Sequence, residues 1–545
     1  MKAIDLYSGV GGWSLGLQLA GIEVVASYER WGPANETNFK NNRHQAQTVD
    51  IRMLMPEDLP QDIDIIVGSP PCTQFSYSNR GGNGDIKDGL QDIKKFLSFV
   101  DHLQPKFWAM ENVPRAAKVI FEELKIGGEL EEYSHLDMTM SVFNMEDFGL
   151  PQRRKRSIIG NFNFDLLTEY SKNNKERSLK QIVSALEFEK PVDPIYEISL
   201  NKDEIVDHVY EAHLNEEEVR INRSNKELHP VYNSMPFPDS MDRSVRTITA
   251  TCTRVSRESV VIERPSNSGL FRRLTVRERA CLQGFPITFQ FYGESYSQKL
   301  KMIGNAVPPL FSFYVGHSFL KTPADPLPEV SNVATKFIPP EPAPKVTVPD
   351  QPGRNYPLSR SFRFAIPSLR LKSGVRFELS NKGRNGEIEW SVKFFFGTSK
   401  SIQTLDLNAN IAASVLNFLS DDDFSLVSAT LSELKASLRV ADIKNMQALW
   451  AHRGPGETRA FMLLDLLNDV GSDVRRTLDK SDFEYDDLIN TILVDQFGEK
   501  SDDLPGIPKL IRNSDLILAG ILVGATANVA IQESYHSRRK AKASS

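Results

Sequence analysis

Residues 5–13 carry the stretch that decides the fold, Asp5-Leu6-Tyr7-Ser8-Gly9-Val10-Gly11-Gly12-Trp13. Three glycines in four positions follow a short apolar run at residues 3–7 and precede an amphipathic run at residues 13–20. Glycine permits a positive φ and a close approach of ligand to backbone, and free amides at a helix start offer hydrogen-bond donors. The stretch therefore predicts a strand, a tight turn and a helix. A ligand at the turn is one interpretation, and a plain connection is the other.

Short apolar runs and amphipathic runs alternate after this turn. Expected strands are residues 24–28, 63–67 and 107–110, and expected helices are residues 34–41 and 93–103. This alternation is typical of parallel βαβ units with helices on both faces of a sheet. Ligands of such sheets gather at the carboxyl ends of the strands. The sequence thus predicts an α/β fold with its functional residues at that edge.

Two acidic residues follow the next expected strands. Glu29 lies about twenty positions beyond the glycines, where a carboxylate commonly binds ribose hydroxyls. Asp50, followed by Ile51, closes the third strand, where it either accepts a hydrogen bond from an adenine amine or caps a turn. Together with the glycines, these residues predict a nucleoside-containing cofactor.

A cysteine follows a buried strand, in Gly68-Ser69-Pro70-Pro71-Cys72-Thr73. Two prolines hold Cys72 at the carboxyl end of the strand, which suits a thiolate nucleophile, while a small apolar residue in a turn is an equal alternative from these residues alone. The other cysteines are Cys252 and Cys281. Three scattered cysteines exclude a disulfide framework and a four-thiolate zinc site, and they indicate a reducing compartment.

The composition is that of a globular chain, with 545 residues, 40% hydrophobic and 25% charged. A formal net charge of −6 neither supports nor excludes a nucleic-acid partner. The sequence shows no secretory leader, and the apolar residues 516–530 are interrupted by glycines and an asparagine. We judge that run too short to span a bilayer and expect a buried helix. A cytoplasmic protein without a membrane partner is expected.

Four further blocks complete an ordered series of motifs. They are Glu111-Asn112-Val113, Gln152-Arg153-Arg154-Lys155-Arg156, the run from Arg273-Leu274-Thr275 to Gln283-Gly284-Phe285-Pro286, and Gly304-Asn305-Ala306-Val307-Pro308. With these blocks, residues 1 to about 320 resemble the DNA cytosine-5 methyltransferase family in motif order, spacing and residue type. The resemblance implies a Rossmann-like, S-adenosylmethionine-dependent methyltransferase sheet with an inserted target-recognition domain.

The resemblance also assigns roles to four catalytic residues. It implies that Cys72 adds to carbon 6 of cytosine, which activates carbon 5 toward a methyl sulfonium. Glu111 would hydrogen-bond the base and share a proton as charge builds. Arg154 would contact the base, and Arg156 would support the site and nearby backbone, because a planar guanidinium offers fixed donors. The neighbouring Arg153 is read as solvated, like Lys155.

A pocket for S-adenosyl-L-methionine is implied in the same way. Its expected residues are Tyr7, Gly9, Gly11, Trp13, Glu29, Trp31, Asp50, Ile51, Pro71, Asn305 and Val307. The sequence departs from the family at Tyr7, where Phe is usual, and at Thr73, where Gln is commoner. Neither departure removes a reacting group. No metal is implied.

Double-stranded DNA is the expected partner. Carbons 5 and 6 of a stacked cytosine cannot lie between a thiol and a sulfonium, so the base must flip out of the duplex. The polar, glycine-rich residues 77–85 are expected to close over the DNA. Arginines alternate with Ser and Thr in residues 243–257, and such side chains read base edges or contact phosphates. The DNA-binding candidates are Ser76, Arg80, Arg246, Thr247, Thr249, Arg254 and Arg257.

The expected domains are a catalytic domain (1–160 plus 271–322), a target-recognition domain (161–270), a Pro-rich linker (323–357) and a separate α+β domain (358–545). Polyproline geometry makes the linker a semi-rigid spacer. In the last domain we expect strands at 361–366, 376–379 and 387–396 and helices within 405–478. It resembles no family and is interpreted as an accessory module for DNA or a protein partner. A nuclease is disfavoured, because strand alternation explains Glu387, Glu389 and Lys393.

The leading hypothesis is a prokaryotic DNA cytosine-5 methyltransferase, acting in restriction–modification, in a related defence system or alone. One alternative is the family's transfer-RNA-directed branch, whose recognition insert is much shorter than the segment between Arg156 and Arg272. Another is a non-catalytic DNA-binding relative, which the intact Cys72, Glu111 and Arg154 disfavour.

Overall fold

The computed structural model describes residues 1–75, 85–227, 234–334, 339–345, 354–371, 374–384, 387–398, 401–480, 486–498 and 504–542. The chain divides into two compact units. The first comprises Met1–Asn222 and Pro236–Gln351, and the second comprises Arg223–Met235 and Pro352–Ser545. Each unit is described by itself.

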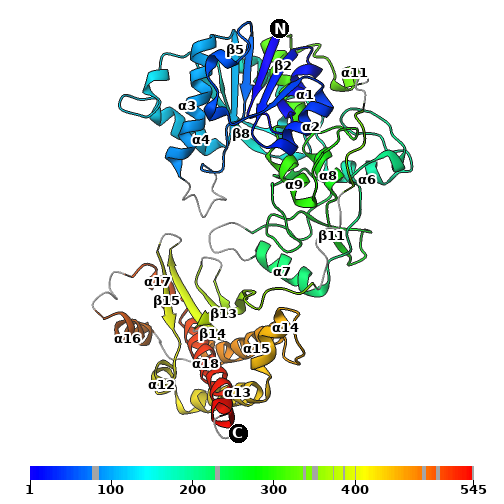
Figure 1. Ribbon diagram of the computed structural model, residues 1–545. Helices are drawn as coiled ribbons and strands as arrows, with labels where there is room; N and C mark the ends of the chain where they lie inside the picture. The colour runs from blue at the N-terminus through cyan, green and yellow to red at the C-terminus, as the bar shows by residue number, and fades with distance from the viewer. Residues whose placement is uncertain are drawn as a thin grey trace. The chain divides into compact units, whose positions relative to one another are not determined.

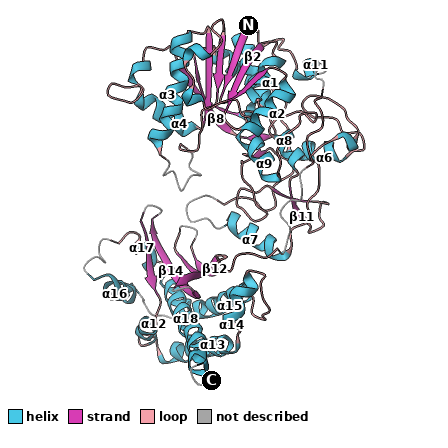
Figure 2. Cartoon of the chain, viewed as in Figure 1, coloured by secondary structure: helices cyan, strands magenta, loops and turns pink. Residues whose placement is uncertain are grey.

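A seven-stranded sheet forms the centre of the first unit, in the order β3-β2-β1-β4-β5-β8-β6 (Figures 1 and 2). Its strands are β1 (Lys2–Leu6), β2 (Glu23–Glu29), β3 (Gln45–Thr48), β4 (Ile65–Gly68), β5 (Phe107–Asn112), β6 (Thr139–Asn144) and β8 (Lys155–Gly160). Strands β1 to β5 pair in parallel, whereas β8 runs antiparallel to β5 and β6. The predicted α/β class is confirmed, and the antiparallel edge is an addition that the sequence did not indicate.

Helices cover both faces of this sheet (Figure 1). Helices α1 (Gly12–Leu19) and α10 (Pro309–Phe319) belong to one hydrophobic cluster, and α3 (Ile86–Leu103) and α4 (Pro114–Glu123) belong to the other. Strand β4 explains the division, because Ile65 and Val67 pack into the first cluster and Ile66 packs into the second. Side chains alternate between the faces of a strand, so an apolar strand needs cover on both sides.

Helix α1 approaches α10 closely at Gly16. A Cβ atom on Gly16 would lie 2.4 Å from the carbonyl oxygen of Pro309 and 2.4 Å from the Cβ of Ser312. Real Cβ atoms essentially never come this near to backbone, so any larger residue must push the two helices apart. The tight contact brings residues 304–309 next to the glycine turn.

We predict that Gly16→Ala destabilises the first unit by about 1–3 kcal/mol, the usual cost of overpacking a core. A lower melting temperature in thermal unfolding would report it. The matched control is Gly32→Ala at the start of α2 (Gly32–Asn42), where nothing lies within 4 Å of an added Cβ. Equal melting temperatures of the two variants would contradict the prediction.

The predicted recognition region contains short elements. They are α5 (Phe164–Tyr170), α6 (Leu179–Glu187), α7 (Glu216–Glu227), β9 (Val245–Arg246), β10 (Val261–Glu263) and β11 (Phe271–Arg273). Strand β9 pairs in parallel with β7 (Gln152–Arg153), and β10 pairs antiparallel with β11. Helices α8 (Val276–Leu282) and α9 (Tyr296–Asn305) then lead back to the sheet. A separate recognition domain remains a proposal, because most of these elements fall in the same compact unit as the sheet.

The Pro-rich segment is bound to the first unit over its described residues up to 345. Ala343 is buried, and its N–H donates to Oε1 of Gln290 (3.1 Å). The carbonyl oxygen of Pro344 accepts from Nζ of Lys299 (2.9 Å), and a short helix, α11, spans Val330–Ala334. Polyproline backbone has no internal hydrogen bonds, so its carbonyl groups find partners elsewhere. The described residues of the segment up to 345 therefore belong to the first unit, and a linker role for the whole segment stays a prediction.

The second unit contains an antiparallel sheet of β12 (Arg363–Arg370), β13 (Arg376–Arg384), β14 (Glu387–Thr398) and β15 (Ser401–Asp406). The helices are α12 (Ala409–Leu416), α13 (Asp421–Val440), α14 (Ile443–Trp450), α15 (Ala460–Asp479), α16 (Asp486–Phe497), α17 (Ile507–Ile511) and α18 (Ser514–Lys542). Three strands and the helical region match the sequence prediction, which missed β15. The expected α+β class is confirmed.

Helix α18 forms the core of this unit. Its residues Ser514–Tyr535 are long and apolar enough to cross a membrane by length and composition, with a mean hydropathy of 1.7, and 78% of that stretch is buried in the protein. Gly520 lies against the ring of Phe377, and Nδ2 of Asn528 donates to the carbonyl oxygen of Val392 (3.0 Å). The predicted buried helix is confirmed, although the helix is longer than the apolar run suggested.

Candidate active site

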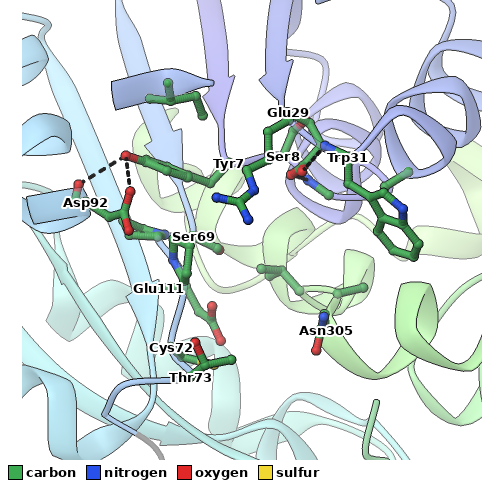
Figure 3. Close-up of a pocket in the computed structure, with 18 of the residues that line it drawn as sticks. Tyr7, Ser8, Glu29, Trp31, Ser69, Cys72, Thr73, Asp92, Glu111 and Asn305 are labelled. Carbon is green, nitrogen blue, oxygen red and sulfur yellow. Dashed lines mark hydrogen bonds between the residues drawn. The ribbon is translucent and has the colours of Figure 1, made fainter. Parts of the chain in front are cut away.

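A cavity of about 450 Å³ lies at the carboxyl ends of β1, β2, β4 and β5 (Figure 3). Four sequence motifs line it: the glycine turn, the acidic residues after β2 and β3, the cysteine loop and residues 301–307. Carboxyl ends of parallel strands meet at one edge of a sheet, which is why motifs far apart in sequence converge here. The sequence predicted this edge as the functional one.

The glycine turn is shaped by packing as well as by φ. Gly11 has a φ of 83°, and an added Cβ would lie 2.0 Å from Oδ1 of Asn38. Trp13 is 1% exposed, and its indole N–H donates to Oγ of Ser69 (3.0 Å). Neither Gly11 nor Trp13 lines the cavity. Here α2 and the cysteine loop occupy the space around them, and contact with a ligand by either residue stays a prediction.

One end of the cavity holds the residues expected to bind a nucleoside. Glu29 accepts the N–H of Gly9 at Oε2 (3.0 Å) and the N–H of Trp31 at Oε1 (2.8 Å). The ring of Trp31 lies 4.5 Å from Nζ of Lys301. These bonds fix the Glu29 carboxylate and the Trp31 backbone on the rim, as Figure 3 shows. Tyr7, Pro71, Asn305 and Val307 also line the cavity.

The turn after β3 forms the side of this end that the sequence predicts to bind adenine. Asp50 accepts the N–H of Arg52 at Oδ1 (3.1 Å), so it caps the short helix Ile51–Met53. It also lines the cavity, and so does the buried Ile51. Both interpretations of Asp50 from the sequence, ligand acceptor and turn cap, are therefore compatible with its place.

The structure adds residues that sequence reasoning missed. Ser8 lines the cavity, and its buried hydroxyl has no hydrogen-bond partner among the described residues. Arg52, Asp88 and Asp92 line it as well. A possible signal was the i, i+4 spacing of Asp88 and Asp92, which places two carboxylates on one face of α3.

The cysteine loop occupies the other end. Cys72 is partly exposed, and Figure 3 shows the Glu111 carboxylate pointing toward it. The loop is held from β5, because Nδ2 of Asn112 donates to the carbonyl oxygen of Pro70 (3.0 Å). The Phe75 N–H donates to the carbonyl oxygen of Cys72 (3.1 Å). The thiol and the nucleoside end thus share one cavity.

The two arginines of the block Gln152-Arg153-Arg154-Lys155-Arg156 have different partners from those expected. Nε of Arg156 binds Oε1 of Glu111 at 2.9 Å. Arg154 is 2% exposed, and its Nη1 and Nη2 donate to the carbonyl oxygens of Ile248 (3.3 Å), Gly304 (3.2 Å) and Ala306 (3.2 Å). Arg154 is therefore engaged with backbone, and Arg156 is the one that touches the carboxylate beside Cys72. Both line the cavity, and which of them contacts the base stays a prediction.

The charges around Cys72 oppose one another. Burial raises the pKa of the Cys72 thiol, the positive charge of Arg156 lowers it, the charge of Glu111 raises it again, and Arg154 lowers it. The net direction is a raised pKa. Without a substrate, the sulfur is therefore a neutral thiol at neutral pH, and a thiolate forms only as pH rises above the usual range for cysteine.

We predict that alkylation of Cys72 by iodoacetamide is slow at neutral pH and accelerates as pH rises above about 9, because only the thiolate reacts. Arg156→Gln removes a charge that lowers the pKa of the thiol, so it should slow alkylation further at pH 8. Peptide-resolved mass spectrometry separates Cys72 from Cys252 and Cys281. A rate already at its plateau at pH 7 would contradict the prediction.

Two arginines predicted to contact DNA are engaged inside the protein. Arg254 is 3% exposed, and it pairs with Glu218 (2.7 Å) and Glu211 (3.2 Å). Arg246 pairs with Asp239 and donates from Nη2 to the carbonyl oxygen of Ser259. These guanidinium groups serve as counter-ions and donors within the recognition region, and DNA contact by either of them stays a prediction.

The other DNA candidates have mixed outcomes. The hydroxyl of Thr247 donates to the carbonyl oxygen of Arg153 (3.0 Å), and that of Thr249 donates to the carbonyl oxygen of Thr251 (2.8 Å). Arg257 is partly buried. Ser76, Arg80 and most of the polar loop lie outside the described residues.

Comparison with known proteins finds similarity to DNA methylases over the first part of the chain. The family model described as "C-5 cytosine-specific DNA methylase" matches residues 1–321. Type II methyltransferase M.NgoPII of Neisseria gonorrhoeae is 28% identical over 348 residues, which cover 59% of this chain and 96% of that protein. Type II methyltransferase M.FnuDI of Fusobacterium nucleatum is 28% identical over 352 residues, with coverages of 60% and 96%. The solved S. pombe Dnmt2 methyltransferase is 18% identical with a TM-score of 0.43, covering 59% of this chain and 98% of its own.

Proposed function

This chain belongs to the C-5 cytosine-specific DNA methylase family, whose model matches residues 1–321, and we propose that it transfers a methyl group from S-adenosylmethionine to carbon 5 of cytosine in double-stranded DNA. The observation that carries the proposal is the shared cavity, in which Cys72 and Glu111 lie at one end and Glu29 and Trp31 at the other. A nucleophile and an adenosyl group need this juxtaposition for methyl transfer.

The residues present fit S-adenosylmethionine. The orphaned hydroxyl of Ser8 offers a donor and an acceptor at the glycine turn. Gly9 has a φ of 52°, and no atom lies within 4 Å of an added Cβ, so the backbone is open to a ligand there. Glu29 would accept from ribose hydroxyls, and the apolar faces of Trp31 and Ile51 would enclose the adenine. When bound, the cofactor supplies an electrophilic methyl group.

The protein's part of the reaction begins at Cys72. Its thiol gives its proton to solvent, and the sulfur bonds to carbon 6 of the cytosine as the double bond between carbons 5 and 6 opens, which places electron density on the ring and makes carbon 5 nucleophilic. Glu111, paired with Arg156 at 2.9 Å, accepts from the exocyclic amine, and when it carries a proton it donates to the ring nitrogen as that charge develops. After carbon 5 is methylated it loses its proton, and the sulfur leaves carbon 6 to restore the aromatic ring.

Arg154 joins the recognition region to the cofactor end of the cavity. Its guanidinium joins the carbonyl oxygen of Ile248 in the recognition region to those of Gly304 and Ala306 beside the cofactor end. Burial lowers the pKa of this guanidinium, with the charge of Arg156 acting in the same direction. The buried group is compensated by its three carbonyl partners.

We also propose that the target base is flipped and that a defined sequence is recognised. Both carbons of the reacting bond must reach Cys72, and a stacked base cannot present them. The Type II methyltransferases among the relatives support a role as the protective enzyme of a restriction–modification system.

The experiment that tests the function is tritiated methyl transfer to duplex DNA and, in parallel, to bulk transfer RNA. We expect label in DNA, at sites that bisulfite sequencing resolves as one recognition sequence. DNA carrying 5-fluorocytosine should trap a covalent complex with the intact protein. Label confined to transfer RNA would show that the substrate is transfer RNA rather than DNA. The absence of label from both would refute the proposed methyltransferase activity.

A further inference from the structure

All three guanidinium nitrogens of Arg52 donate hydrogen bonds to residues of helix α3. Nε and Nη2 bind the two carboxylate oxygens of Asp92 at 2.9 and 2.6 Å. Nη1 binds Oδ1 of Asp88 (2.8 Å) and Oε1 of Gln91 (3.1 Å), and Nη2 also binds the carbonyl oxygen of Asp88 (2.9 Å). Bidentate pairing fixes both distance and orientation. The turn that follows Asp50 is therefore joined rigidly to the start of α3.

The same start of α3 holds the cysteine loop. Oδ2 of Asp88 accepts from Nε2 of Gln74 (3.3 Å), and Oε1 of Gln74 accepts the N–H of Asp85 (3.0 Å). Gln74 lies two residues after Cys72. The Asp88 carboxylate therefore bridges Arg52, on the adenine side of the cavity, and Gln74, beside the nucleophile.

Packing reinforces this bridge. Phe75 is fully buried, and a Cβ on Gly89 would lie 2.9 Å from its ring and 3.0 Å from Cβ of Gln74. The backbone of α3 thus touches the cysteine loop with no room for a larger residue. A displacement of α3 by a few tenths of an ångström must move Gln74 and Phe75.

Tyr7 connects the glycine turn to the same network. Its backbone has a φ of 54°, which is uncommon for a bulky residue. Its hydroxyl donates to Oδ1 and to the carbonyl oxygen of Asp92, both at 3.3 Å (Figure 3). Phe, the usual residue at this position of the family, has no such hydroxyl. The network thus includes two walls of the cofactor end and the loop of the nucleophile.

We propose that Arg52 is a positioning residue, which through Asp88 transmits occupation of the adenine end of the cavity to Gln74 and the adjacent Cys72. The inference rests on the proposed function. A ligand against Ile51 restrains the turn that carries Arg52, and through Arg52 it restrains the two paired carboxylates of α3. These pairs are partly buried, because the side chain of Asp92 is only 9% exposed and that of Arg52 is 32% exposed. Partly buried, bidentate pairs hold their geometry better than solvated ones. Any such coupling between sites is reciprocal.

Kinetics supply the first test. Arg52→Gln should lower kcat for DNA methylation by about 10–100-fold, while the Kd of S-adenosylhomocysteine, measured by calorimetry, changes less than about threefold. Arg52→Lys keeps the charge without the fork, so it should recover part of kcat. The control is Lys94→Gln on the same helix, whose exposed pair with Glu132 lies away from the cavity. That variant should match the unmodified protein.

Alkylation of Cys72 supplies the second test, which does not require turnover. Adenosine reaches only the adenine and ribose end, so it does not cover the thiol. We expect saturating adenosine to slow iodoacetamide alkylation of Cys72 at least threefold in the unmodified protein. In Arg52→Gln the slowing should be less than 1.5-fold, because the variant lacks the side chain that couples the adenine end to the cysteine loop. Circular dichroism and melting temperature report whether each variant is folded.

The outcomes separate the two proposals. If the unmodified protein methylates no DNA, the function fails, and the adenosine effect still decides the role of Arg52. The positioning role is overturned if Arg52→Gln keeps kcat within twofold, if it loses affinity for S-adenosylhomocysteine in proportion to kcat, or if adenosine affects Cys72 equally in both proteins. A variant that fails to fold is replaced by Asp88→Asn, which removes one charge of the bridge and must give the same pattern.

Discussion

Cys72→Ala is expected to lower kcat for DNA methylation by about 10⁵-fold or more, the scale seen when a covalent nucleophile is removed. Without the sulfur, no bond forms at carbon 6 and carbon 5 does not become nucleophilic. Binding of S-adenosylhomocysteine should change little, because the bonds of Glu29 to Gly9 and Trp31 do not involve Cys72. Single-turnover assays with tritiated cofactor measure the first effect and calorimetry the second.

The control for this prediction is Cys252→Ser. Cys252 accepts from Nη2 of Arg279 at 3.1 Å and lies outside the lining of the cavity, and serine retains an acceptor there. We expect kcat within about threefold of the unmodified protein. If the Cys72→Ala variant still forms a covalent complex on 5-fluorocytosine DNA, Cys72 is not the nucleophile.

Glu111→Gln is expected to act in opposite directions on two properties of the site. Methyl transfer should fall by about 10²–10⁴-fold, because the group that hydrogen-bonds the reacting base loses its charge. Alkylation of Cys72 should become faster, because the charge of Glu111 raises the pKa of that thiol and Arg156, released from the 2.9 Å pair, lowers it. A general loss of structure would also lower methyl transfer, but it would accelerate alkylation at every cysteine rather than at Cys72 alone.

The matched control is Glu122→Gln, an exposed carboxylate paired with Lys125 on the surface. It should leave both rates unchanged, since exposed pairs contribute little. Mass spectrometry of the Cys72 peptide at pH 8, together with single-turnover methylation, gives both numbers from one preparation. Slower alkylation in Glu111→Gln would show that the electrostatic account of the thiol is wrong.

Sequence patterns predicted the sheet of the first unit well. Strands β1, β2, β4 and β5 and helices α1 and α2 were expected within a few residues, because apolar periodicity and glycine turns are local properties of the chain. Helix α3 begins at Ile86 rather than at the expected residue 93. The antiparallel strand β8 and the strand β15 were not expected. Their pairing depends on partners from other parts of the chain, and a short apolar run gives no direction.

The candidate site was predicted unevenly. Tyr7, Glu29, Cys72 and Glu111 line one cavity as expected, because each follows a parallel strand and all such ends meet at one edge. Ser8 and Arg52 were missed, because a serine in a turn and an arginine in a polar loop are common and carry no pattern of their own.

Sequence by itself determined the alternation of strands and helices up to β5, the edge where ligands gather and the cysteine and carboxylate placed there, since local periodicity and backbone preference encode them. Tertiary structure alone decided the partners of the arginines. Arg254 reads as a DNA contact until Glu218, 36 residues away, is seen 2.7 Å from it. Arg154 binds three backbone carbonyl groups, Arg156 pairs with Glu111, and Arg52 joins two carboxylates of α3. A guanidinium looks the same in a sequence whether it is solvated or buried, and only the fold selects which distant oxygen atoms reach it.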